Sequence, residues 1–452
     1  MAPHRTSLMS RRAFLRLSAG TATAAWLGST TFGRVLAQES TPIPTPTPIP
    51  GLSGEVIVWG WKGGIEHFLA VIPDLQKLYP DVSVRVEEMS YEDTHTNILA
   101  VVNTGVGVPD VVNFDVNHLG EFAEGMTDLT DRLQPYLEEI MPVSVKLATY
   151  KGRILGVPQD SQPVGMFYRH DLFEQYGIDA AQVETYADLI EAGRKVAKAT
   201  NGEVKMLAMD VGSKICMGDP HLIIDLLLVQ NGLGGTYFNR EDDKVLVDSP
   251  EAIEAMEVLK QISDEEICFI DMSDDAAVAA YAADKILATV APGWFPLAMT
   301  GNLPQLSGKW RMMRLPAIKP GGLRASYQIP SITAIPKGAP NPDAAWELIR
   351  MAQVSLEGQL RFTEMTGGVM PTWKRALDTL KDQEVEYFGG QKIYALFIEI
   401  AQDIPDVWFG RGWPEARSII RKHTETVIRR EKTPEEACKA AAEEMRVKLN
   451  KG

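Results

Sequence analysis

The chain has 452 residues, of which 45% are hydrophobic and 23% charged, so it is long enough to bury more than one hydrophobic core. Its formal net charge of −15 argues against a protein that wraps nucleic acid or docks on anionic lipid. Its three cysteines provide neither a disulfide framework nor a pair at metal-ligand spacing.

The first 37 residues have the pattern of an export signal. The twin-arginine motif is matched by SRRAFLR at residues 10–16, and a weakly apolar stretch follows at residues 17–33. An amphipathic N-terminal helix is the alternative, but the stretch is rich in Thr, Ser and Gly and too short to span a bilayer. We therefore predict a twin-arginine signal peptide over residues 1–37 and a periplasmic or extracellular location.

A linker is expected next, over residues 38–53. It contains the sequence TPIPTPTPIP at residues 41–50, with a proline at every second position. Such a segment cannot join a helix or the interior of a sheet, so it should form an extended spacer.

Beyond the linker, strand and helix patterns alternate. The expected elements are a strand over residues 55–61, a helix over 65–79, a strand over 82–86, a helix over 91–103 and a strand over 111–114. This alternation predicts an α/β unit with a largely parallel sheet. Because ligands of such sheets collect beyond the carboxyl ends of the strands, residues 59–64 and 115–118 are the first candidates for a site.

The last hundred residues are predicted to be mostly helical, over 342–353, 391–401, 413–430 and 433–448. In the last of these helices Cys438 falls on an apolar face, and Cys268 lies in an apolar run, so both are expected in the core. Trp310 and Trp346 are expected in the core for the same reason.

Motifs for common enzyme chemistry are absent. There is no G-x-S-x-G, Walker loop, dinucleotide fingerprint, H-E-x-x-H or calcium loop. Asp115 and Asp160 are one pair of carboxylates that glycoside hydrolysis could use, but a chain with 60 acidic residues offers many such pairs. We expect a protein that is not an enzyme and that needs no cofactor and no metal.

An ordered set of short motifs resembles a known family. It runs through VIVWGW (56–61), PDVV (109–112), GVPQD (156–160), FYRHDLF (167–173), APGW (291–294), GKWR (308–311), AIPKGA (334–339) and AAWEL (344–348). Together these motifs are similar to family 1 extracellular solute-binding proteins, the maltose-binding-protein-like sugar receptors of ABC importers. The resemblance covers about residues 54–448.

The resemblance implies a two-lobed periplasmic-binding-protein (Venus-flytrap) α/β fold. Each lobe would be a mainly parallel sheet flanked by helices, and hinge crossovers would join the lobes. The N-lobe would hold residues 54–159 and 315–350, and the C-lobe residues 160–314 and 351–452. Solute would bind in the cleft, and the lobes would close around it. The closed receptor, expected to be a monomer, would then dock on the membrane permease of an ABC transporter.

The resemblance also implies which residues face the cleft. Carried over position by position, they are Trp61, Lys62, Phe114, Asp115, Asn117, His118, Asp160, Gln162, Asp219, His221, Trp294, Tyr327, Trp408, Trp413 and Arg417. At the first strand the chain departs from maltose receptors, because Gly63 and Gly64 replace polar contact residues.

These residue types suit a sugar, because an aromatic ring takes its apolar C–H face while acids, amides and guanidinium groups take its hydroxyls. Other roles remain open for several of them. Asp115 and Asp160 could cap helices, and a lone histidine such as His118 or His221 could be structural. Of Trp59 and Trp61, one is expected to face the core and the other the cleft.

Three functions fit these residues. The first is a receptor for a sugar or oligosaccharide, and the second is the same fold binding a polyamine, a glycerophosphodiester or an opine-like acid. The third is a secreted carbohydrate-active enzyme. A cationic ligand would favour a cage of acids, and a phosphate would favour helix N-termini with arginine. The mixed lining of Trp, Asp, Gln and His favours a neutral, hydroxylated ligand.

Overall fold

The computed structural model describes residues 47–209, 220–234, 237–270, 272–366 and 368–451. Every described residue belongs to one compact unit, Thr45–Gly452. The predicted signal peptide and most of the predicted linker therefore lie outside the described residues. Within the described part, no helix is both long and apolar enough to cross a membrane.

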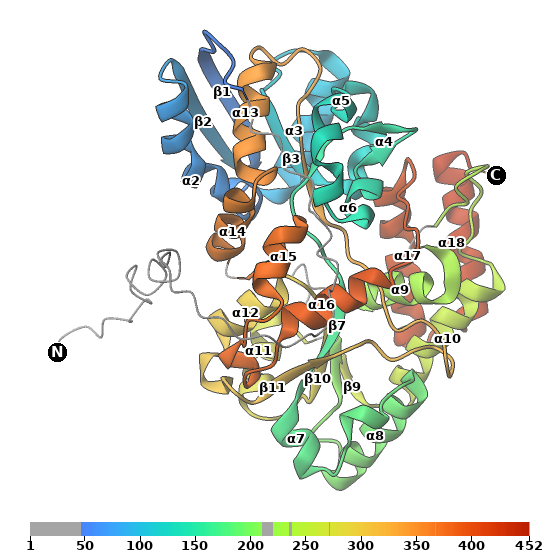
Figure 1. The fold of residues 1–452 in the computed structure, drawn as a ribbon. Helices are drawn as coiled ribbons and strands as arrows, with labels where there is room; N and C mark the ends of the chain where they lie inside the picture. The colour runs from blue at the N-terminus through green and yellow to red at the C-terminus, as the bar shows by residue number, and fades with distance from the viewer. Residues whose placement is uncertain (1–46, 210–219, 235–236, 271, 367, 452) are drawn as a thin grey trace, which may run out of the picture. The chain divides into compact units, whose positions relative to one another are not determined.

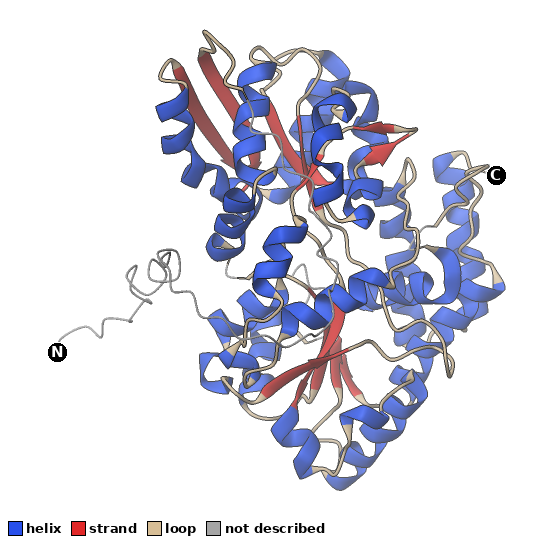
Figure 2. Cartoon of the chain, viewed as in Figure 1, coloured by secondary structure: helices blue, strands red, loops and turns tan. Residues whose placement is uncertain are grey.

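The first sheet has five strands in the order β2-β1-β3-β12-β6 (Figures 1 and 2). Its strands are β1 (Gly54–Trp61), β2 (Val82–Met89), β3 (Val111–Asp115), β6 (Val157–Pro158) and β12 (Ser331–Ala334). Strand β1 is parallel to β2 and β3, whereas β12 is antiparallel to β3 and β6. The predicted alternation of strands and helices over residues 55–114 is confirmed.

The two tryptophans of β1 lie on the same face of the strand, because side chains two residues apart point in the same direction. Both are partly exposed, whereas Val56 and Val58, which come earlier in the strand, are fully buried. The expectation that one tryptophan would face the core and the other the cleft was therefore wrong. Trp59 donates a hydrogen bond from its indole nitrogen to Glu87 on β2, at 2.6 Å.

Four helices pack around this sheet (Figure 1). They are α2 (Lys62–Leu78), α3 (Tyr91–Thr104), α13 (Pro342–Gln353) and α14 (Leu356–Met365). Helix α2 buries Ile65, Phe68, Val71 and Leu75, whose spacing places them on one helical face. Helices α13 and α14 both pack against α2, although about 280 residues of sequence separate α2 from these two helices.

The second sheet has the order β10-β7-β11, with β7 (Val164–Arg169) antiparallel to both β10 (Ala288–Pro292) and β11 (Trp310–Met313). Both pairings in this sheet are therefore antiparallel, in contrast to the mainly parallel sheet that was expected, because β7 enters it from the crossover between the sheets. Phe167 of β7 lies at the centre of the core, with ring centroids of Phe295, Phe388 and Phe397 at 5.3–6.2 Å. Trp310 is fully buried in the same core, as predicted.

The remaining elements connect and cover the two sheets. Between β3 and β6 lie η1 (Val116–His118), α4 (Leu119–Phe122), η2 (Ala123–Gly125), α5 (Thr130–Leu133), η3 (Gln134–Glu139), α6 (Pro142–Leu147), β4 (Thr149–Tyr150) and β5 (Arg153–Ile154). Around the second sheet lie α7 (His170–Gln175), η4 (Ala180–Gln182), α8 (Tyr186–Ala199), β8 (Leu207–Met209), α9 (Pro220–Leu228), η5 (Val229–Leu233), α10 (Pro250–Asp264), β9 (Cys268–Ile270), α11 (Asp274–Ala282), α12 (Phe295–Asn302) and η6 (Pro304–Leu306).

The C-terminal part is helical, as predicted. It contains α15 (Lys374–Leu380), η7 (Glu386–Phe388), α16 (Ile393–Gln402), α17 (Trp413–Ile428) and α18 (Pro434–Leu449). Cys268 and Cys438 are both buried, and Trp346 is only 6% exposed, so all three predictions of a core position are confirmed.

Three crossover segments, residues 159–164, 326–331 and 370–372, run side by side between the two sheets. The first two are joined by backbone bonds from Gln159 to Ser331 (3.1 Å), from Gln328 to Gln162 (2.9 Å) and from Val164 to Ser326 (3.1 Å). The third is joined to the first by a bond from the Ser161 amide to the Met370 carbonyl (2.9 Å). Side chains on these segments therefore lie close to the carboxyl end of β3.

Candidate functional site

The first group of site residues lies at the carboxyl ends of β1 and β3, where Trp61 and Asp115 are the last strand residues. The Asp115 carboxylate accepts a hydrogen bond from the Tyr91 hydroxyl (2.6 Å) and one from the Ser331 hydroxyl (3.0 Å). Burial raises the pKa of Asp115, although these two donors act in the opposite direction. The sequence expectation that this edge carries polar candidates agrees with this geometry. We call these four residues, with His95 and His118, the Asp115 cluster.

A stack of rings forms the aromatic side of the Asp115 cluster. The ring of Trp61 stacks on His95 with 5.7 Å between centroids, His95 stacks on His118 at 4.1 Å, and His118 stacks on Phe122 at 5.4 Å. Tyr91 meets Trp61 edge-on at 5.2 Å. The stack runs from fully buried Phe122 to partly exposed Trp61, so Trp61 and Tyr91 are the rings that a ligand would meet.

His95 fixes the geometry of this group. Its Nδ1 lies 2.8 Å from the Tyr91 carbonyl oxygen and therefore carries the hydrogen, which leaves Nε2 to accept from the Asp115 amide at 3.3 Å. Burial, and secondarily the neighbouring His118, lower the pKa of His95 to about 3. His95 is thus neutral and joins α3 to the end of β3.

Tyr91 and His95 were missed by the sequence reasoning. They are four residues apart at the start of α3, so they share one face of that helix. The spacing is a usable signal for a shared face, but nothing in the sequence indicates that this face meets the end of β3.

The two glycines after β1 have a packing explanation. A Cβ on Gly64 would lie 2.1 Å from Asn113 Oδ1 and 3.2 Å from Trp61 Cε2, whereas one on Gly63 would have no contact closer than 3.8 Å. Gly64 therefore lets the first turn of α2 approach β3 and lets the Trp61 indole lie against it. The neighbouring Lys62 is exposed and forms an ion pair with Glu66, at 3.6 Å.

Two of the predicted residues point into the protein interior. Phe114 is fully buried and meets Phe122 edge-on at 5.0 Å. Asn117 is 5% exposed, and its Oδ1 has no hydrogen-bond partner among the described residues. The structure therefore does not bring these two side chains to the open side of the Asp115 cluster.

The crossover segments carry a second group of predicted residues. Asp160 accepts hydrogen bonds from the Ser331 amide (2.8 Å) and from the Gln162 side chain (2.6 Å). Burial, with a contribution from the charge of Asp115, raises the pKa of Asp160 to about 7. Ser331 therefore bridges Asp115 and Asp160, with its hydroxyl on the first and its amide on the second.

Trp294 and Tyr327 are anchored to the same segments. The Trp294 indole nitrogen donates to Gln328 at 3.0 Å, and the ring is partly exposed. The hydroxyl of Tyr327 lies 3.3 Å from that of Ser161, and burial raises the pKa of Tyr327 to about 12. Both rings are therefore held beside Asp160 and Gln162.

Helices α9 and α17 provide a third group. Arg417 donates from Nε to Asp225 at 3.1 Å and lies over the ring of Trp413, with 5.6 Å to its centroid. Trp413 is 1% exposed and stacks on Tyr237, with centroids 5.1 Å apart. Arg417 is also close enough to lower the pKa of Asp115. Trp413, Arg417, Tyr327 and Asp225 line one small cavity together.

The last three predicted site residues are Trp408, Asp219 and His221. Trp408 is partly buried in the segment between α16 and α17, where it lines a small cavity with Val116, Leu119 and Tyr150. Asp219 lies outside the described residues. The backbone of His221 belongs to α9, and nothing is described for its side chain.

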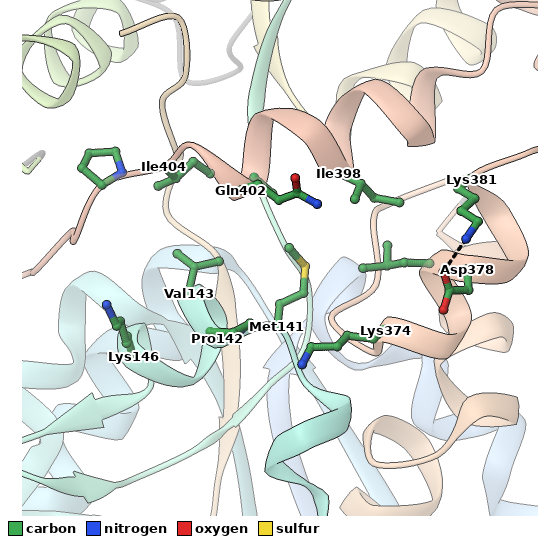
Figure 3. A pocket seen from close by; sticks show the side chains of 13 residues that line it. Met141, Pro142, Val143, Lys146, Lys374, Asp378, Lys381, Ile398, Gln402 and Ile404 are labelled. Carbon is green, nitrogen blue, oxygen red and sulfur yellow. Dashed lines mark hydrogen bonds and ion pairs between the residues drawn. The ribbon is translucent and has the colours of Figure 1, made fainter. Parts of the chain in front are cut away.

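A larger pocket, of about 750 Å³, is lined by none of the predicted residues (Figure 3). Its lining includes Met141, Leu377 and Ile398 together with Lys146, Lys374 and Lys381. Each lysine has a partner. Lys381 forms an ion pair with Asp378 (2.7 Å), Lys146 forms one with Asp406 (3.7 Å), and Lys374 donates a hydrogen bond to the Glu138 carbonyl oxygen (2.7 Å). The lining contains no aromatic ring on which a sugar could stack.

In the described ranges, no group of three or more His, Cys, Asp and Glu side chains comes together in a way that could hold a metal ion. The Asp115 cluster, the crossover residues and the α9–α17 group instead combine partly exposed rings with carboxylates, amides and one guanidinium group. This combination suits recognition of hydroxyl groups beside an apolar ring face.

Comparison with known proteins identifies relatives over most of the chain. Residues 63–353 match the family of bacterial extracellular solute-binding proteins. An arabinooligosaccharide-binding protein of Halalkalibacterium halodurans is 22% identical over 404 residues, which cover 86% of this chain and 88% of that protein. A lactose-binding protein of Rhizobium radiobacter is also 22% identical, covering 79% of this chain and 84% of its own length.

Solved structures show the same fold. The galacto-N-biose/lacto-N-biose I-binding protein of an ABC transporter from Bifidobacterium longum, in complex with lacto-N-biose, has a TM-score of 0.73 at 19% identity and covers 88% of this chain and 98% of its own. An ABC transporter-associated binding protein from B. animalis subsp. lactis, in complex with β-1,6-galactobiose, has a TM-score of 0.70 at 19% identity, over 87% and 97% of the two chains.

Proposed function

The chain belongs to the bacterial extracellular solute-binding proteins, and from this premise we propose that it is a receptor that binds a sugar or oligosaccharide and delivers it to an ABC transporter permease. The observation that carries the proposal is the Asp115 cluster, in which the rings of Trp61 and Tyr91 stand beside the carboxylate of Asp115. The names of the relatives, which bind arabinooligosaccharides and lactose, support the same ligand class.

The chemistry of the cluster suits a neutral sugar. Trp61 and Tyr91 offer apolar ring surface to the C–H face of a pyranose or furanose, which costs little conformational entropy because aromatic side chains have few rotatable bonds. Each oxygen of Asp115 accepts one internal hydrogen bond, so each keeps a lone pair for a sugar hydroxyl. Arg417 is already paired with Asp225 and also acts on the charge of Asp115, which disfavours an anionic ligand.

Two lobes enclose this ligand. The N-lobe holds residues 54–159 and 315–350, and the C-lobe holds residues 160–314 and 351–452. The packing of α14 against α2 favours extending the second N-lobe segment to Met365. The pairing of β12 with β3 and β6, together with the backbone bonds between residues 326–331 and 159–164, favours residues 326–331 as the second passage between the lobes. Rotation at the crossover segments closes the cleft around the ligand.

The receptor works outside the cytoplasm. Residues 1–37 direct export by the twin-arginine route, and the Thr/Pro-rich residues 38–53 hold the globular part away from the N-terminus. The protein acts as a monomer, has no catalytic activity of its own and delivers its sugar to the membrane subunits of the transporter.

A thermal-shift screen of the purified mature chain against neutral sugars tests the proposal. The panel contains arabinooligosaccharides, lactose, galactobiose and maltose, with spermidine and glycerophosphocholine as the competing ligand classes. A sugar at 100 times its Kd should stabilise the protein by about 2.7 kcal/mol. Small-angle scattering with the same sugar should show a smaller radius of gyration. Stabilisation by spermidine alone, or hydrolysis of any glycan in the panel, would contradict the proposal.

A further inference from the structure

A pocket of about 750 Å³ lies between α6 on one side and α16 with the residues after it on the other, and α15 lines it as well (Figure 3). Six apolar side chains in its lining belong to the core around Phe167 or pack against that core. They are Met141, Leu377, Ala401, Val143, Ile398 and Ile404. The first three are at most 7% exposed, and the other three are partly exposed. The pocket therefore has an apolar interior, and its volume falls in the range of about 300–1,000 Å³ that is usual for small-molecule sites.

Two lysines of α15 line the same pocket (Figure 3). Lys374 donates a hydrogen bond to the Glu138 carbonyl oxygen at 2.7 Å, and because a carbonyl group has no formal charge, this bond does not neutralise Lys374. Lys381 forms an ion pair with Asp378 at 2.7 Å, so these two charges cancel. The α15 side of the pocket therefore carries net positive charge.

The lysine of α6 adds to this charge. Lys146 lines the pocket and lies 3.7 Å from Asp406, which is beyond the range of a hydrogen bond. Asp406 also forms an ion pair with Arg240, so one carboxylate serves two cations. The lining lysines and their ionic partners thus comprise four cations and two carboxylates. The pocket lies in a locally positive region of a chain whose formal net charge is −15.

The crossover segments separate this pocket from the Asp115 cluster. Backbone bonds join the three segments in the order second, first, third. At the edge formed by the second segment, the Ser331 hydroxyl donates to Asp115. At the edge formed by the third segment, the Met141 amide donates to the Thr372 carbonyl oxygen at 3.0 Å. The segments therefore lie between the Asp115 cluster and the pocket, so an occupant of the pocket is a second ligand.

The chemistry of the pocket defines its ligand. An apolar chain that enters it leaves water and meets Met141, Leu377 and Ile398, while a negative head group meets Lys374 and the largely exposed Lys146. A cationic head group would be repelled by the same charges, and a sugar would find no aromatic ring in the lining. We propose that this pocket is a second ligand site, which takes a free carboxylate with an apolar chain of medium length. The inference goes beyond the proposed function and does not depend on it.

Calorimetric titration of the purified mature chain with decanoate, below the concentration at which it forms micelles, tests the site. Decyltrimethylammonium and acetate are the matched probes, because the first reverses the charge and the second removes the chain. We expect one decanoate per chain, an affinity at least about tenfold higher than that of the cation, and no saturation by acetate. The decanoate affinity should fall as the salt concentration rises. Equal affinities for decanoate and the cation, or no saturable binding of decanoate, would overturn the proposal.

A second measurement locates the decanoate bound to the wild-type chain. The ¹³C-methyl resonance of Met141 should shift when decanoate is added, whereas that of Met365, which is 45% exposed on α14, should not. Replacement of each methionine by leucine assigns the two resonances. Saturable binding that leaves the Met141 resonance unchanged would contradict the proposal. The chain should not co-float with phosphatidylglycerol vesicles, and co-flotation that decanoate competes away would assign the pocket to a membrane lipid instead.

Substitutions at the pocket should weaken decanoate binding. Ile398→Glu places a carboxylate at a partly exposed apolar position and should lower the affinity more than about tenfold. Its matched control Val447→Glu, at an exposed apolar residue of α18, should leave the affinity unchanged. Lys374→Met should lower the affinity about two- to fivefold, and Lys439→Met, at an exposed lysine paired with Glu435, should not. Unchanged affinity in both folded pocket variants would sink the proposal.

The sugar that the thermal-shift panel identifies separates this site from the cleft. That sugar should bind without displacing decanoate, because the crossover segments lie between the two sites. Displacement would place decanoate in the cleft and overturn the proposal. If no sugar binds, the proposed function fails, and the decanoate titrations still decide whether the pocket is a ligand site.

Discussion

Trp61 and Trp413 are both predicted ligand contacts, yet their surroundings differ in kind. Trp61 rests on His95 with its ring partly exposed, at the open end of a stack. Trp413 is 1% exposed, with Tyr237 on its face at 5.1 Å, Phe409 edge-on at 5.0 Å and Arg417 above it. The difference teaches that a ring is available to a ligand only where its neighbours support one side and leave the other uncovered.

The charges of the two regions differ in the same way. In the Asp115 cluster, His95, which accepts from the Asp115 amide, is neutral, and the Asp115 carboxylate has two hydroxyl donors rather than a directly bonded cation. In the α9–α17 group Asp225 is paired directly with Arg417 and also accepts from the Tyr237 hydroxyl. The first region is therefore suited to sugar hydroxyls, and the second to holding α9 and α17 together.

Replacing Trp413 gives the largest expected effect. Because its ring is enclosed, Trp413→Ala should lower the free energy of unfolding by about 3–5 kcal/mol, measured by denaturant titration. Trp59→Ala, at a partly exposed ring on β1, is the control and should cost much less. A Trp413→Ala variant that is as stable as wild type but no longer binds sugar would remove the distinction between the two regions.

Replacing Trp61 should affect binding more than stability. Trp61→Ala removes a stacking surface, so we expect sugar affinity to fall by about 1–3 kcal/mol while the free energy of unfolding falls by less than in Trp413→Ala. Calorimetry and denaturant titration on the same preparation measure the two quantities. Unchanged affinity would mean that the open end of the stack is not a ligand surface.

The two glycines beside Trp61 should give small effects of opposite sign. Gly63→Ala meets nothing closer than 3.8 Å and replaces a poor helix former in the first turn of α2, so it should stabilise the protein by about 0.5 kcal/mol. Gly64→Ala must displace Asn113 and should be destabilising. Equal melting temperatures of the two variants would show that α2 does not approach β3 as closely as described.

Much of the fold could be predicted from the sequence, because local patterns encode it. The strands and helices of residues 54–115 follow the spacing of apolar residues, and the burial of Trp310, Trp346, Cys268 and Cys438 follows their apolar neighbours. The antiparallel pairing of the second sheet could not be predicted, because the direction of β7 depends on where the chain enters that sheet. The orientation of Trp59 was predictable from strand geometry, and the prediction there was mistaken.

The candidate site was only partly predictable. Residue types and the family resemblance indicated Asp115, Asp160, Trp61 and Arg417. In the structure Ser331 connects Asp115 to Asp160, Tyr91 connects Asp115 to Trp61, and Arg417 acts on the charge of Asp115. Tyr91, His95 and Ser331 were missed, because their roles depend on contacts between segments far apart in the chain. Ser331, for example, lies 171 residues from Asp160 and 216 from Asp115.

The position of β12 has a consequence for biosynthesis. This strand lies between β3 and β6, so a ribosome must extend the chain past Ala334 before those two strands can be joined. Pairings over such long separations form slowly, and until then β3 and β6 keep unpaired edges that favour aggregation. A nascent chain of this protein is therefore most vulnerable late in translation, before β12 has joined β3 to β6.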